Sequence, residues 1–273
     1  MLAVRVEEFG GLEKVRLAEV PAPEAGPDQV RIRVHAAGVN FADILMVKGT
    51  YQASPTPPFT PGMEVAGEVI EAGADIKWFR PGDRLIAVLD HGGFAEEALA
   101  HHSRIMHIPE GMSYEEAAGV PIVYGTSHVA LNHRTRLSPG ETLLVHGAAG
   151  GAGLTAVEIG KALGATVIAA ASTREKREIV RRYGADHVLD SSSENVADRV
   201  NEITGGRGAD VIYDPVGGDA FNASLRCAAF EARIIIVGFA SGRIPRIPAN
   251  ILLVKNISAI GYYWGAYATH GLQ

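Results

Sequence analysis

Gly147-Ala-Ala-Gly-Gly-Ala-Gly153 is the stretch that decides the fold of this chain. It follows an apolar run at residues 142–146 and precedes an amphipathic pattern, which is the order of a buried strand, a tight turn and a helix. Gly150 and Gly153 stand where a dinucleotide fingerprint has its second and third glycines, and Ala148 occupies the first position. Backbone N–H groups at the start of the helix would face phosphates, so we expect a nucleotide here.

Apolar runs of strand length alternate with helical patterns beyond this turn. Strands are predicted at residues 166–171, 187–190, 209–214, 232–237 and 257–262, and helices at residues 174–183, 194–204 and 219–229. Such alternation is typical of a parallel sheet with crossover helices on both faces. The half of the chain from about residue 137 onward is therefore predicted to be a doubly wound nucleotide-binding domain.

The end of the second predicted strand indicates which dinucleotide binds. About twenty residues after the last glycine of such a turn, an acidic side chain would bind a free ribose 2′-hydroxyl. This chain instead has Ala171-Ser-Thr-Arg-Glu-Lys-Arg177, which offers hydroxyl groups, a helix N-terminus and three cations suited to a 2′-phosphate. The same residues also fit a capping box of Ser172 with Glu175 and a solvated helix face, and both interpretations can hold together. The pattern favours NADPH over NADH.

Length and composition agree with a soluble enzyme. The chain has 273 residues, of which 47% are hydrophobic and 21% charged, and a net charge of −6 argues against a broad nucleic-acid surface. No apolar run approaches the length of a membrane span, and the N-terminus lacks the apolar core of a signal peptide. We therefore expect a cytoplasmic protein with no membrane or nucleic-acid partner. The single cysteine, Cys227, is predicted to lie in the core.

The first half of the chain has a different pattern. Short alternating runs at residues 30–35, 64–70 and 84–88 are separated by segments rich in proline and glycine, which predicts a mostly antiparallel β domain. Residues 113–136 are then predicted to form one or two helices, interrupted near Pro121 and Gly125.

Motifs along essentially the whole chain resemble the zinc-independent quinone oxidoreductases of the medium-chain dehydrogenase/reductase superfamily. They are Gly38-Val-Asn-Phe-Ala-Asp43, Pro58-Phe-Thr-Pro-Gly-Met-Glu-Val-Ala-Gly67, residues 140–153, Tyr213-Asp-Pro-Val-Gly-Gly218 and Gly261-Tyr-Tyr-Trp-Gly265. The resemblance implies an α/β fold class, with a GroES-like β-barrel catalytic domain at residues 1–120 and an NADP-binding Rossmann domain, a doubly wound parallel sheet, at residues 121–265.

The same resemblance implies an NADPH-dependent reductase that acts on quinones or other α,β-unsaturated carbonyl compounds, including enones and enoyl thioesters. A non-catalytic, crystallin-like NADPH-binding protein with a structural or sensing role is the alternative. Relatives form homodimers, and an apolar edge strand at residues 257–262 would pair with its copy across a two-fold axis.

Four side chains are implied by the resemblance to polarise the substrate or to line the reaction site: Asn40, Asp43, Tyr51 and Thr126. Each has a structural alternative that the residues leave open. Asn40 would be a turn residue, Asp43 a helix N-terminal charge, Tyr51 a packed ring, and Thr126 a hydroxyl bound to its own helix.

The cofactor residues are implied in the same way. Ala149, Gly150, Gly151, Ala152 and Gly153 would bind the pyrophosphate, Ser172 and Lys176 the 2′-phosphate, Ser191 would lie beside the adenosine, and Gly238, Phe239, Ala240, Gly261, Tyr262 and Tyr263 would line the nicotinamide. The glycines could equally be plain turn residues, although the carboxyl edge of such a sheet is where ligands bind.

We expect no metal site. A catalytic zinc needs a thiolate and an imidazole, but Asn40 and Met63 stand where zinc-dependent relatives carry cysteine and histidine. His101 and His102 are adjacent in a predicted strand and would point apart. By resemblance, family members continue for about another fifty residues and return to the barrel. Residues 266–273 would begin that return, and the usual C-terminal completion of the barrel is expected to be absent.

Overall fold

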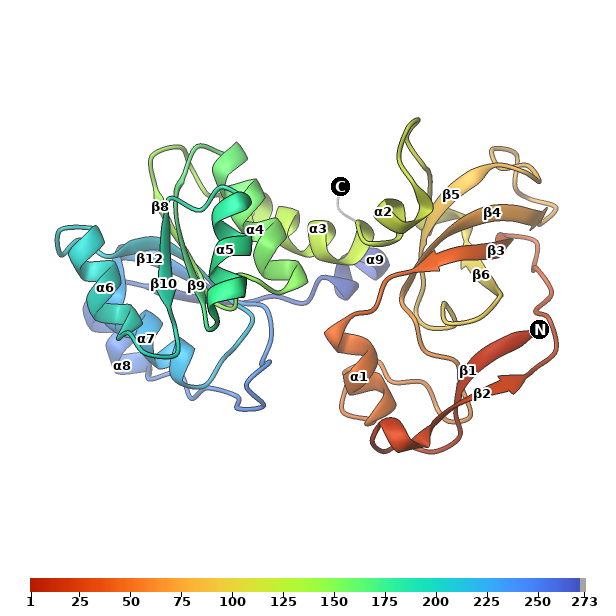
Figure 1. Ribbon diagram of the computed structural model, residues 1–273, viewed down its shortest axis with the longest axis horizontal. Coiled ribbons are helices and arrows are strands. Elements are labelled where there is room, and N and C mark those ends of the chain that lie inside the picture. The colour runs from red at the N-terminus through yellow and green to blue at the C-terminus, as the bar shows by residue number, and fades with distance from the viewer. Residues whose placement is uncertain (271–273) are drawn as a thin grey trace. The chain divides into compact units, whose positions relative to one another are not determined.

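The structure is a computed structural model that describes residues 1–270. The chain divides into two compact units, Met1–Ile122 and Val123–Gln273. Figure 1 shows the strands of the first unit in red to yellow and the elements of the second in green to blue. No helix within residues 1–270 is both long enough and apolar enough to cross a membrane.

The first unit is built on antiparallel strands. A five-stranded sheet has the order β6-β3-β4-β5-β7, and β1 pairs with β2 beside it. The elements are β1 (Leu2–Val6), β2 (Val15–Glu19), β3 (Gln29–Ala37), α1 (Phe41–Val47), β4 (Glu64–Ala72), β5 (Arg84–Val88), β6 (Glu97–His101), β7 (Ile105–His107) and α2 (Tyr114–Ala118), with short 3-10 turns at Leu12–Lys14 and His102–Arg104. The predicted antiparallel β domain is confirmed.

Alternation along the strands of this unit explains its core. In β3 the side chains of Val30 and Ile32 are buried, whereas those of Arg31 and Arg33 pair with glutamates of neighbouring strands. A period of two places apolar residues on one face of the sheet and charges on the other. The buried face packs Val30 and Ile32 against residues of β4, β5 and β6 in one cluster.

The second unit is a six-stranded parallel sheet with the order β10-β9-β8-β11-β12-β13. Its strands are β8 (Thr142–Val145), β9 (Thr166–Ala171), β10 (His187–Asp190), β11 (Ala209–Asp214), β12 (Ala228–Ile236) and β13 (Ser258–Gly261). Its helices are α3 (Pro121–His128, which begins at the end of the first unit), a π-helical continuation at Val129–Arg134, α4 (Gly151–Ala162), α5 (Arg174–Arg182), α6 (Val196–Ile203), α7 (Asp219–Cys227), α8 (Ala249–Lys255) and α9 (Gly265–His270).

Two apolar clusters lie on opposite faces of this sheet. Leu143 and Val145 of β8 face the cluster shared with α4 and α5, whereas Leu144 faces the cluster shared with α6 and α7. Because both faces are covered, the strands are apolar at nearly every position rather than at alternate ones. Figure 1 shows the helices on both sides of the strands. The predicted doubly wound sheet with helices on both faces is confirmed.

The clearest differences from the sequence prediction are at three places. Helix α4 begins at Gly151, inside the glycine turn, and β12 begins at Ala228, inside the region predicted to be helical, because Ala228 pairs with Ala209 of β11. The predicted interruption at Gly125 is wrong, since α3 continues through it. A Cβ atom at Gly125 would lie 2.7 Å from the Trp264 ring, so this glycine permits close packing rather than ending the helix.

Helix α9 occupies Gly265–His270 and includes residues 266–270 of the segment that we expected to begin a return to the barrel. The remainder of that segment, residues 271–273, lies outside the described residues.

Candidate functional site

The glycine turn places helix α4 directly at the carboxyl end of β8. Gly147 has a φ of 55°, a left-handed conformation that glycine adopts without strain, and Gly150 is the N-cap of α4. The first N–H groups of a helix lie outside the intrahelical ladder and carry its positive dipole end. The first turn of α4 contains no acidic residue that would occupy them. The N-terminus of α4 is therefore suited to an anionic ligand.

Two glycines of this turn serve different purposes. A Cβ atom at Gly153 would lie 2.4 Å from the carbonyl oxygen of Gly147 and 2.7 Å from Cα of Ala148, so the protein itself requires glycine there. A Cβ atom at Gly150 would meet nothing closer than 3.5 Å, and the backbone there has an ordinary φ of −77°. A Cβ atom at Gly150 would partly fill the open space above this residue. With glycine, that space fits the close approach of a pyrophosphate.

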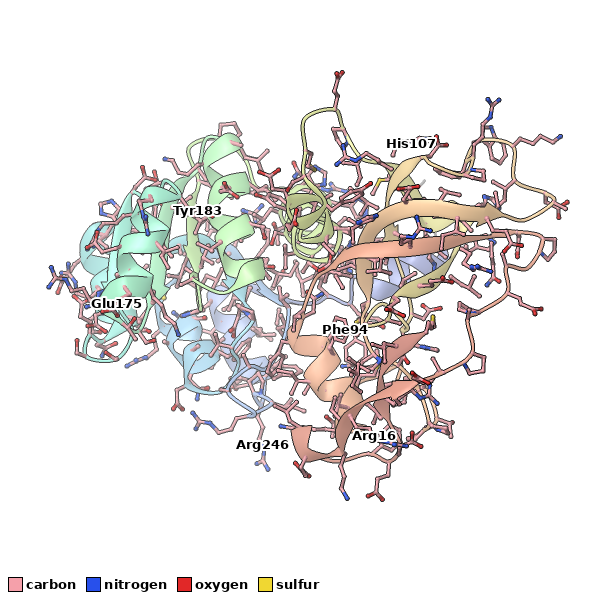
Figure 2. The ribbon with its side chains drawn as sticks, turned by 45° about the vertical axis from the view of Figure 1, so that its right-hand side comes forward. Arg16, Phe94, His107, Glu175, Tyr183 and Arg246 are labelled. Carbon is pink, nitrogen blue, oxygen red and sulfur yellow. The ribbon has the colours of Figure 1, made fainter. Side chains whose placement is uncertain are left out.

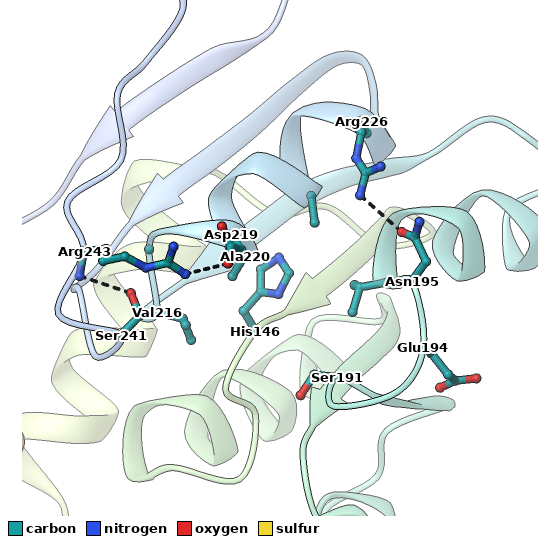
Figure 3. A pocket seen from close by; sticks show the side chains of 13 residues that line it. His146, Ser191, Glu194, Asn195, Val216, Asp219, Ala220, Arg226, Ser241 and Arg243 are labelled. Atoms are coloured by element: carbon teal, nitrogen blue, oxygen red, sulfur yellow. Dashed lines mark hydrogen bonds and ion pairs between the residues drawn. The ribbon is translucent and has the colours of Figure 1, made fainter.

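A cavity of about 380 Å³ lies at the carboxyl ends of β8, β10 and β11. Figure 3 shows its lining side chains, among them Ser191, which the sequence analysis had placed beside the adenosine. Residues that it had not singled out complete the lining: His146, Glu194, Asn195, Val196, Val216, Gly217, Asp219, Ala220, Ala223, Arg226, Ser241 and Arg243. Most of them follow strand ends or begin helices, so the position of each strand's carboxyl end was the available signal, whereas Ala223 and Arg226 lie further along α7.

Polar contacts hold the rim of this cavity. Arg243 forms an ion pair with Asp219 at 2.5 Å, and Nη2 of Arg226 donates a hydrogen bond to Oδ1 of Asn195 at 3.2 Å. Figure 3 marks both contacts. Asn195 follows β10, Asp219 and Arg226 belong to α7, and Arg243 follows β12, so the two pairs tie α7 to the segments on either side of the cavity.

His146 contributes a buried imidazole to the cavity wall. Its Nε2 lies 2.9 Å from Oγ of Ser224, and that hydroxyl donates its own hydrogen to the carbonyl oxygen of Ala220. We therefore assign the Nε2–H tautomer, with the hydroxyl oxygen accepting. Burial lowers the pKa of His146, and the nearby Asp214 carboxylate opposes that shift. The imidazole is accordingly neutral at neutral pH.

Asp214 ends β11 as a fully buried carboxylate. Its Oδ1 accepts hydrogen bonds from the backbone N–H groups of Val216 and Gly217, at 2.8 and 2.9 Å. Its Oδ2 has no hydrogen-bond partner among the described residues. The carboxylate thus fixes the turn that presents Val216 and Gly217 to the cavity.

The predicted 2′-phosphate region lies at the start of α5. Thr173, rather than Ser172, is the N-cap, and its Oγ1 accepts from the backbone N–H of Lys176 at 3.3 Å, so the capping box proposed for Ser172 and Glu175 is wrong. One of the three cations, Arg177, is paired with Asp190 at 2.7 Å. Ser172, which follows β9, and Lys176 in the first turn of α5 are both exposed, as is Glu175 between them, which Figure 2 labels.

The ends of β12 and β13 carry the residues expected to line the nicotinamide. Gly238, Phe239 and Ala240 follow β12, and the backbone N–H of Ala240 donates to the carbonyl oxygen of Pro215. Tyr262 follows β13, and its hydroxyl donates to the carbonyl oxygen of Thr126 at 2.9 Å. Burial raises the pKa of Tyr262 above its ordinary value. Two predicted site residues from distant parts of the chain, Thr126 and Tyr262, are therefore in contact.

In the first unit, Asn40 and Asp43 lie at the start of α1. Asn40 is the N-cap and Asp43 the third helical residue, and together they form a capping box. Oδ2 of Asp43 accepts from the backbone N–H of Asn40 at 2.8 Å, and Oδ1 accepts from that of Gly62 at 3.2 Å. Burial raises the pKa of Asp43, while these two hydrogen bonds lower it. Both structural interpretations of these residues thus apply.

Glu64 is the residue of this region that sequence reasoning missed. It begins β4 with only 2% of its surface exposed, and its Oε1 accepts a hydrogen bond from Nδ2 of Asn40 at 2.8 Å. Burial raises its pKa, two accepted hydrogen bonds lower it, and the charge of Asp43 raises it further. The available signal was an acidic residue between the apolar residues Met63 and Val65, at the start of the predicted strand.

Tyr51 packs against a small apolar cluster that contains Val6, Met46 and Phe59, as its packed-ring interpretation expects. Met63, which stands at a zinc-ligand position of related enzymes, belongs to the same cluster.

Potential metal ligands do not gather within residues 1–270, where no three His, Cys, Asp or Glu side chains are placed to hold a metal ion. The rings of His101 and His102 lie 4.5 Å apart and tilted, so the expectation that they point apart is wrong. The strand ends at His101 and a 3-10 turn follows, which removes the alternation on which that expectation depended. Cys227 is buried as expected, and burial raises the pKa of its thiol to about 11.

Known proteins resemble both units. Residues 26–110 match the family profile described as alcohol dehydrogenase GroES-like domain, and residues 151–271 match that of zinc-binding dehydrogenase. A quinone oxidoreductase-like protein 2 homolog of Nematostella vectensis is 47% identical over 91% of this chain and 68% of its own length. The quinone oxidoreductase of Homo sapiens is 36% identical over 96% of this chain and 79% of its own length.

Solved structures agree with these relatives. A quinone oxidoreductase of Pseudomonas syringae has a TM-score of 0.93 and 31% identity, covering 98% of this chain and 83% of its own. A quinone oxidoreductase of Escherichia coli, solved in complex with NADPH, has a TM-score of 0.90 and 29% identity, covering 98% of this chain and 82% of its own.

The two glycines of the turn should respond differently to alanine. Gly150→Ala should keep the melting temperature and weaken NADPH binding about tenfold or more, because the added methyl occupies space that only the ligand needs. Gly153→Ala, the matched control, should lower the free energy of unfolding by about 1–3 kcal/mol, because the methyl meets backbone atoms. Thermal unfolding and calorimetric titration with NADPH measure both effects, and equal binding by Gly150→Ala and the unchanged protein would contradict the assignment.

The buried His146 should make stability depend on pH. Its folded-state pKa is lowered, so the unfolded chain binds the proton more readily, and stability is lost as pH falls from about 6.5 through the folded pKa. The slope is at most about 1.4 kcal/mol per pH unit. His146→Gln, which keeps a donor toward Ser224, should lose this component. Melting temperatures of both proteins between pH 8 and pH 5 test it, and parallel profiles would show that His146 does not titrate on unfolding.

Proposed function

Because the chain belongs to the zinc-independent quinone oxidoreductase branch of the medium-chain dehydrogenase/reductase superfamily, we propose that it is an NADPH-dependent reductase of quinones or other α,β-unsaturated carbonyl compounds. The observation that carries the proposal is the open space above Gly150 at the N-terminus of α4, in a unit that also has a cavity lined by residues after β8, β10, β11 and β12. The quinone oxidoreductase relatives and the NADPH complex of one of them support the same reaction class.

The proposed cofactor contacts follow the carboxyl edge of the sheet. The turn from Ala149 to Gly153 would hold the pyrophosphate, Ser172 and Lys176 the 2′-phosphate, and the cavity with Ser191 the adenosine. Residues 238–240 and 261–263 would lie along the nicotinamide. When bound, NADPH would supply the hydride. The absence of an acidic side chain at the end of β9, where Ala171 is followed by Ser172 and Thr173, supports NADPH over NADH.

The chain's own contribution would be to orient and polarise the acceptor. Negative charge develops on the carbonyl oxygen of a quinone or enone during reduction, and hydrogen-bond donors stabilise it there. Nδ2 of Asn40 has two hydrogens, of which Glu64 accepts one, so the second is the donor that we assign to the acceptor. Thr126 of α3 offers a further hydroxyl, and the proton that completes the reduction would come from solvent.

We also propose a homodimer that forms at the edge of the parallel sheet. Strand β13 is the last strand of the sheet order, so one side of it carries unpaired backbone groups. Large apolar side chains are exposed in the elements before it, including Phe230 at 72%, Ile244 at 75% and Leu253 at 77%. Edge pairing across a two-fold axis would satisfy the backbone groups and could cover such side chains.

Acceptor-dependent oxidation of NADPH tests the reductase. We expect absorbance at the nicotinamide band to fall with at least one of a 1,4-benzoquinone, 9,10-phenanthrenequinone, an enone and a crotonyl thioester, and to fall faster with NADPH than with NADH. Asn40→Ser keeps an N-cap residue but removes the amide, and should lower kcat about a hundredfold with unchanged NADPH affinity.

Lys176→Ala tests the cofactor preference, since it should raise the Kd for NADPH more than the Kd for NADH. If the protein binds NADPH tightly but no acceptor causes its oxidation, the reductase proposal is refuted. The protein would then bind NADPH for a structural or sensing role.

The oligomeric state tests the proposed dimer interface at the edge of the parallel sheet. Sedimentation should give a dimer at micromolar concentration, and Ile260→Pro, which places a proline in β13, should shift it toward monomer because proline cannot donate to a ladder. A Leu17→Ser exchange at an exposed position of β2 is the control and should leave the dimer intact. A monomer in the unchanged protein would refute the interface.

A further inference from the structure

We infer that Glu64 is a positioning residue for the proposed reduction: its carboxylate holds one N–H of the Asn40 amide so that the other N–H faces the carbonyl oxygen of the acceptor. This inference rests on the proposed function. Glu64 itself would touch neither the acceptor nor NADPH and would act through Asn40.

The carboxylate of Glu64 receives two donors from different elements. Oε1 accepts from Nδ2 of Asn40 at 2.8 Å, and Oε2 accepts from the backbone N–H of Ile122 at 2.9 Å, in the first turn of α3. An ionised carboxylate only accepts hydrogen bonds, so the amide of Asn40 must turn its nitrogen, not its oxygen, toward Glu64. The contact therefore determines which way round the amide lies.

Helix α1 holds the backbone of Asn40. Asn40 is the N-cap residue: its backbone carbonyl oxygen accepts from the backbone N–H of Asp43 at 3.1 Å, and its backbone N–H donates to Oδ2 of Asp43 at 2.8 Å. The side-chain amide therefore extends from a fixed backbone, and Glu64 holds one of its N–H groups. Asn40 is only partly buried, so its second N–H remains for a ligand.

Gly38 shows that the chain makes room for this carboxylate. A Cβ atom at Gly38 would lie 2.2 Å from Oε1 of Glu64 and 2.7 Å from the carbonyl oxygen of Ala118. Any larger residue would push the carboxylate away from Asn40. Two motifs that are far apart in sequence, Gly38-Val-Asn40 and Met63-Glu64, therefore build one arrangement around a single amide.

Burial of Glu64 is costly unless its oxygens are hydrogen-bonded, and both are. Burial also raises the pKa of Glu64 and Asp43, whose charges repel each other. Glutamine would relieve that repulsion at nearly the same volume. It has only one acceptor oxygen, however, and cannot satisfy both Ile122 N–H and Asn40 Nδ2. Glutamate fits this position because two hydrogen-bond acceptor oxygens are needed there.

The experiment compares Glu64→Gln with the double variant Asn40→Asp/Glu64→Gln. In the single variant the amide of Asn40 either loses its hydrogen-bond acceptor or rotates by 180° about its side-chain bond. In both cases kcat should fall about tenfold to a hundredfold, while the Kd for NADPH stays unchanged.

In the double variant the introduced glutamine amide donates to the introduced carboxylate and still accepts from the Ile122 N–H, so the hydrogen bonds and the total charge are kept. Its melting temperature should return toward that of the unchanged protein. Turnover should not return, because a carboxylate at position 40 has no N–H to offer the acceptor.

Two outcomes would overturn the inference: unchanged kcat in Glu64→Gln, or recovery of turnover in the double variant. The second would show that Glu64 serves only the fold. No acceptor-dependent oxidation by the unchanged protein would instead refute the proposed function, and the two failures are thus distinct.

A measurement on the unchanged protein covers the case in which neither variant folds. With ¹⁵N-labelled asparagine, one side-chain amide proton of Asn40 should be hydrogen-bonded and protected from exchange, and the other should exchange freely. Two freely exchanging protons would overturn the inference without any activity assay.

Discussion

The contact on which the nucleotide-binding unit depends is the one between Gly153 and the backbone of Gly147 and Ala148. Because no side chain intervenes, α4 starts directly against the end of β8, and its first N–H groups face outward at the carboxyl edge of the sheet. The buried faces of the strands then place the other loops. Leu143 and Val145 face one cluster and Leu144 the other, so crossovers on both sides bring the loops after β10, β11 and β12 to the same edge.

The first unit depends on buried carboxylates in a comparable way. Asp43 and Glu64 are almost completely buried, which is unfavourable for a charge without hydrogen bonds. Each therefore accepts two donors: Asp43 joins the start of α1 to Gly62, and Glu64 joins Asn40 to the start of α3. These hydrogen bonds hold the loops that carry the residues in fixed positions. Burial raises the pKa of both carboxyl groups, and these hydrogen bonds oppose that shift.

Motifs that identify the family correspond to separate physical requirements. Gly153 is needed for packing and Gly150 leaves room for a ligand, although both belong to the same turn. Asp214 of the Tyr213–Gly218 motif holds a turn by two backbone hydrogen bonds. Gly125 and Gly38 accommodate a ring and a carboxylate from distant segments. A sequence pattern shows that glycine stands at a position, but the neighbour that requires it is known only from the folded chain.

Sequence alone determined the order of the elements, because strand and helix periodicity is local: residues 166–171, 187–190 and 209–214 form the strands predicted for them. It also indicated the glycine turn between β8 and α4, since that turn lies within one short segment. Contacts between distant segments were decided only by the tertiary structure. Thr173 replaced Ser172 as the cap, helix α3 passed through Gly125, Tyr262 reached Thr126, and Glu64 reached Asn40. Such contacts depend on how strands and helices pack in three dimensions, and no local pattern along the chain encodes them.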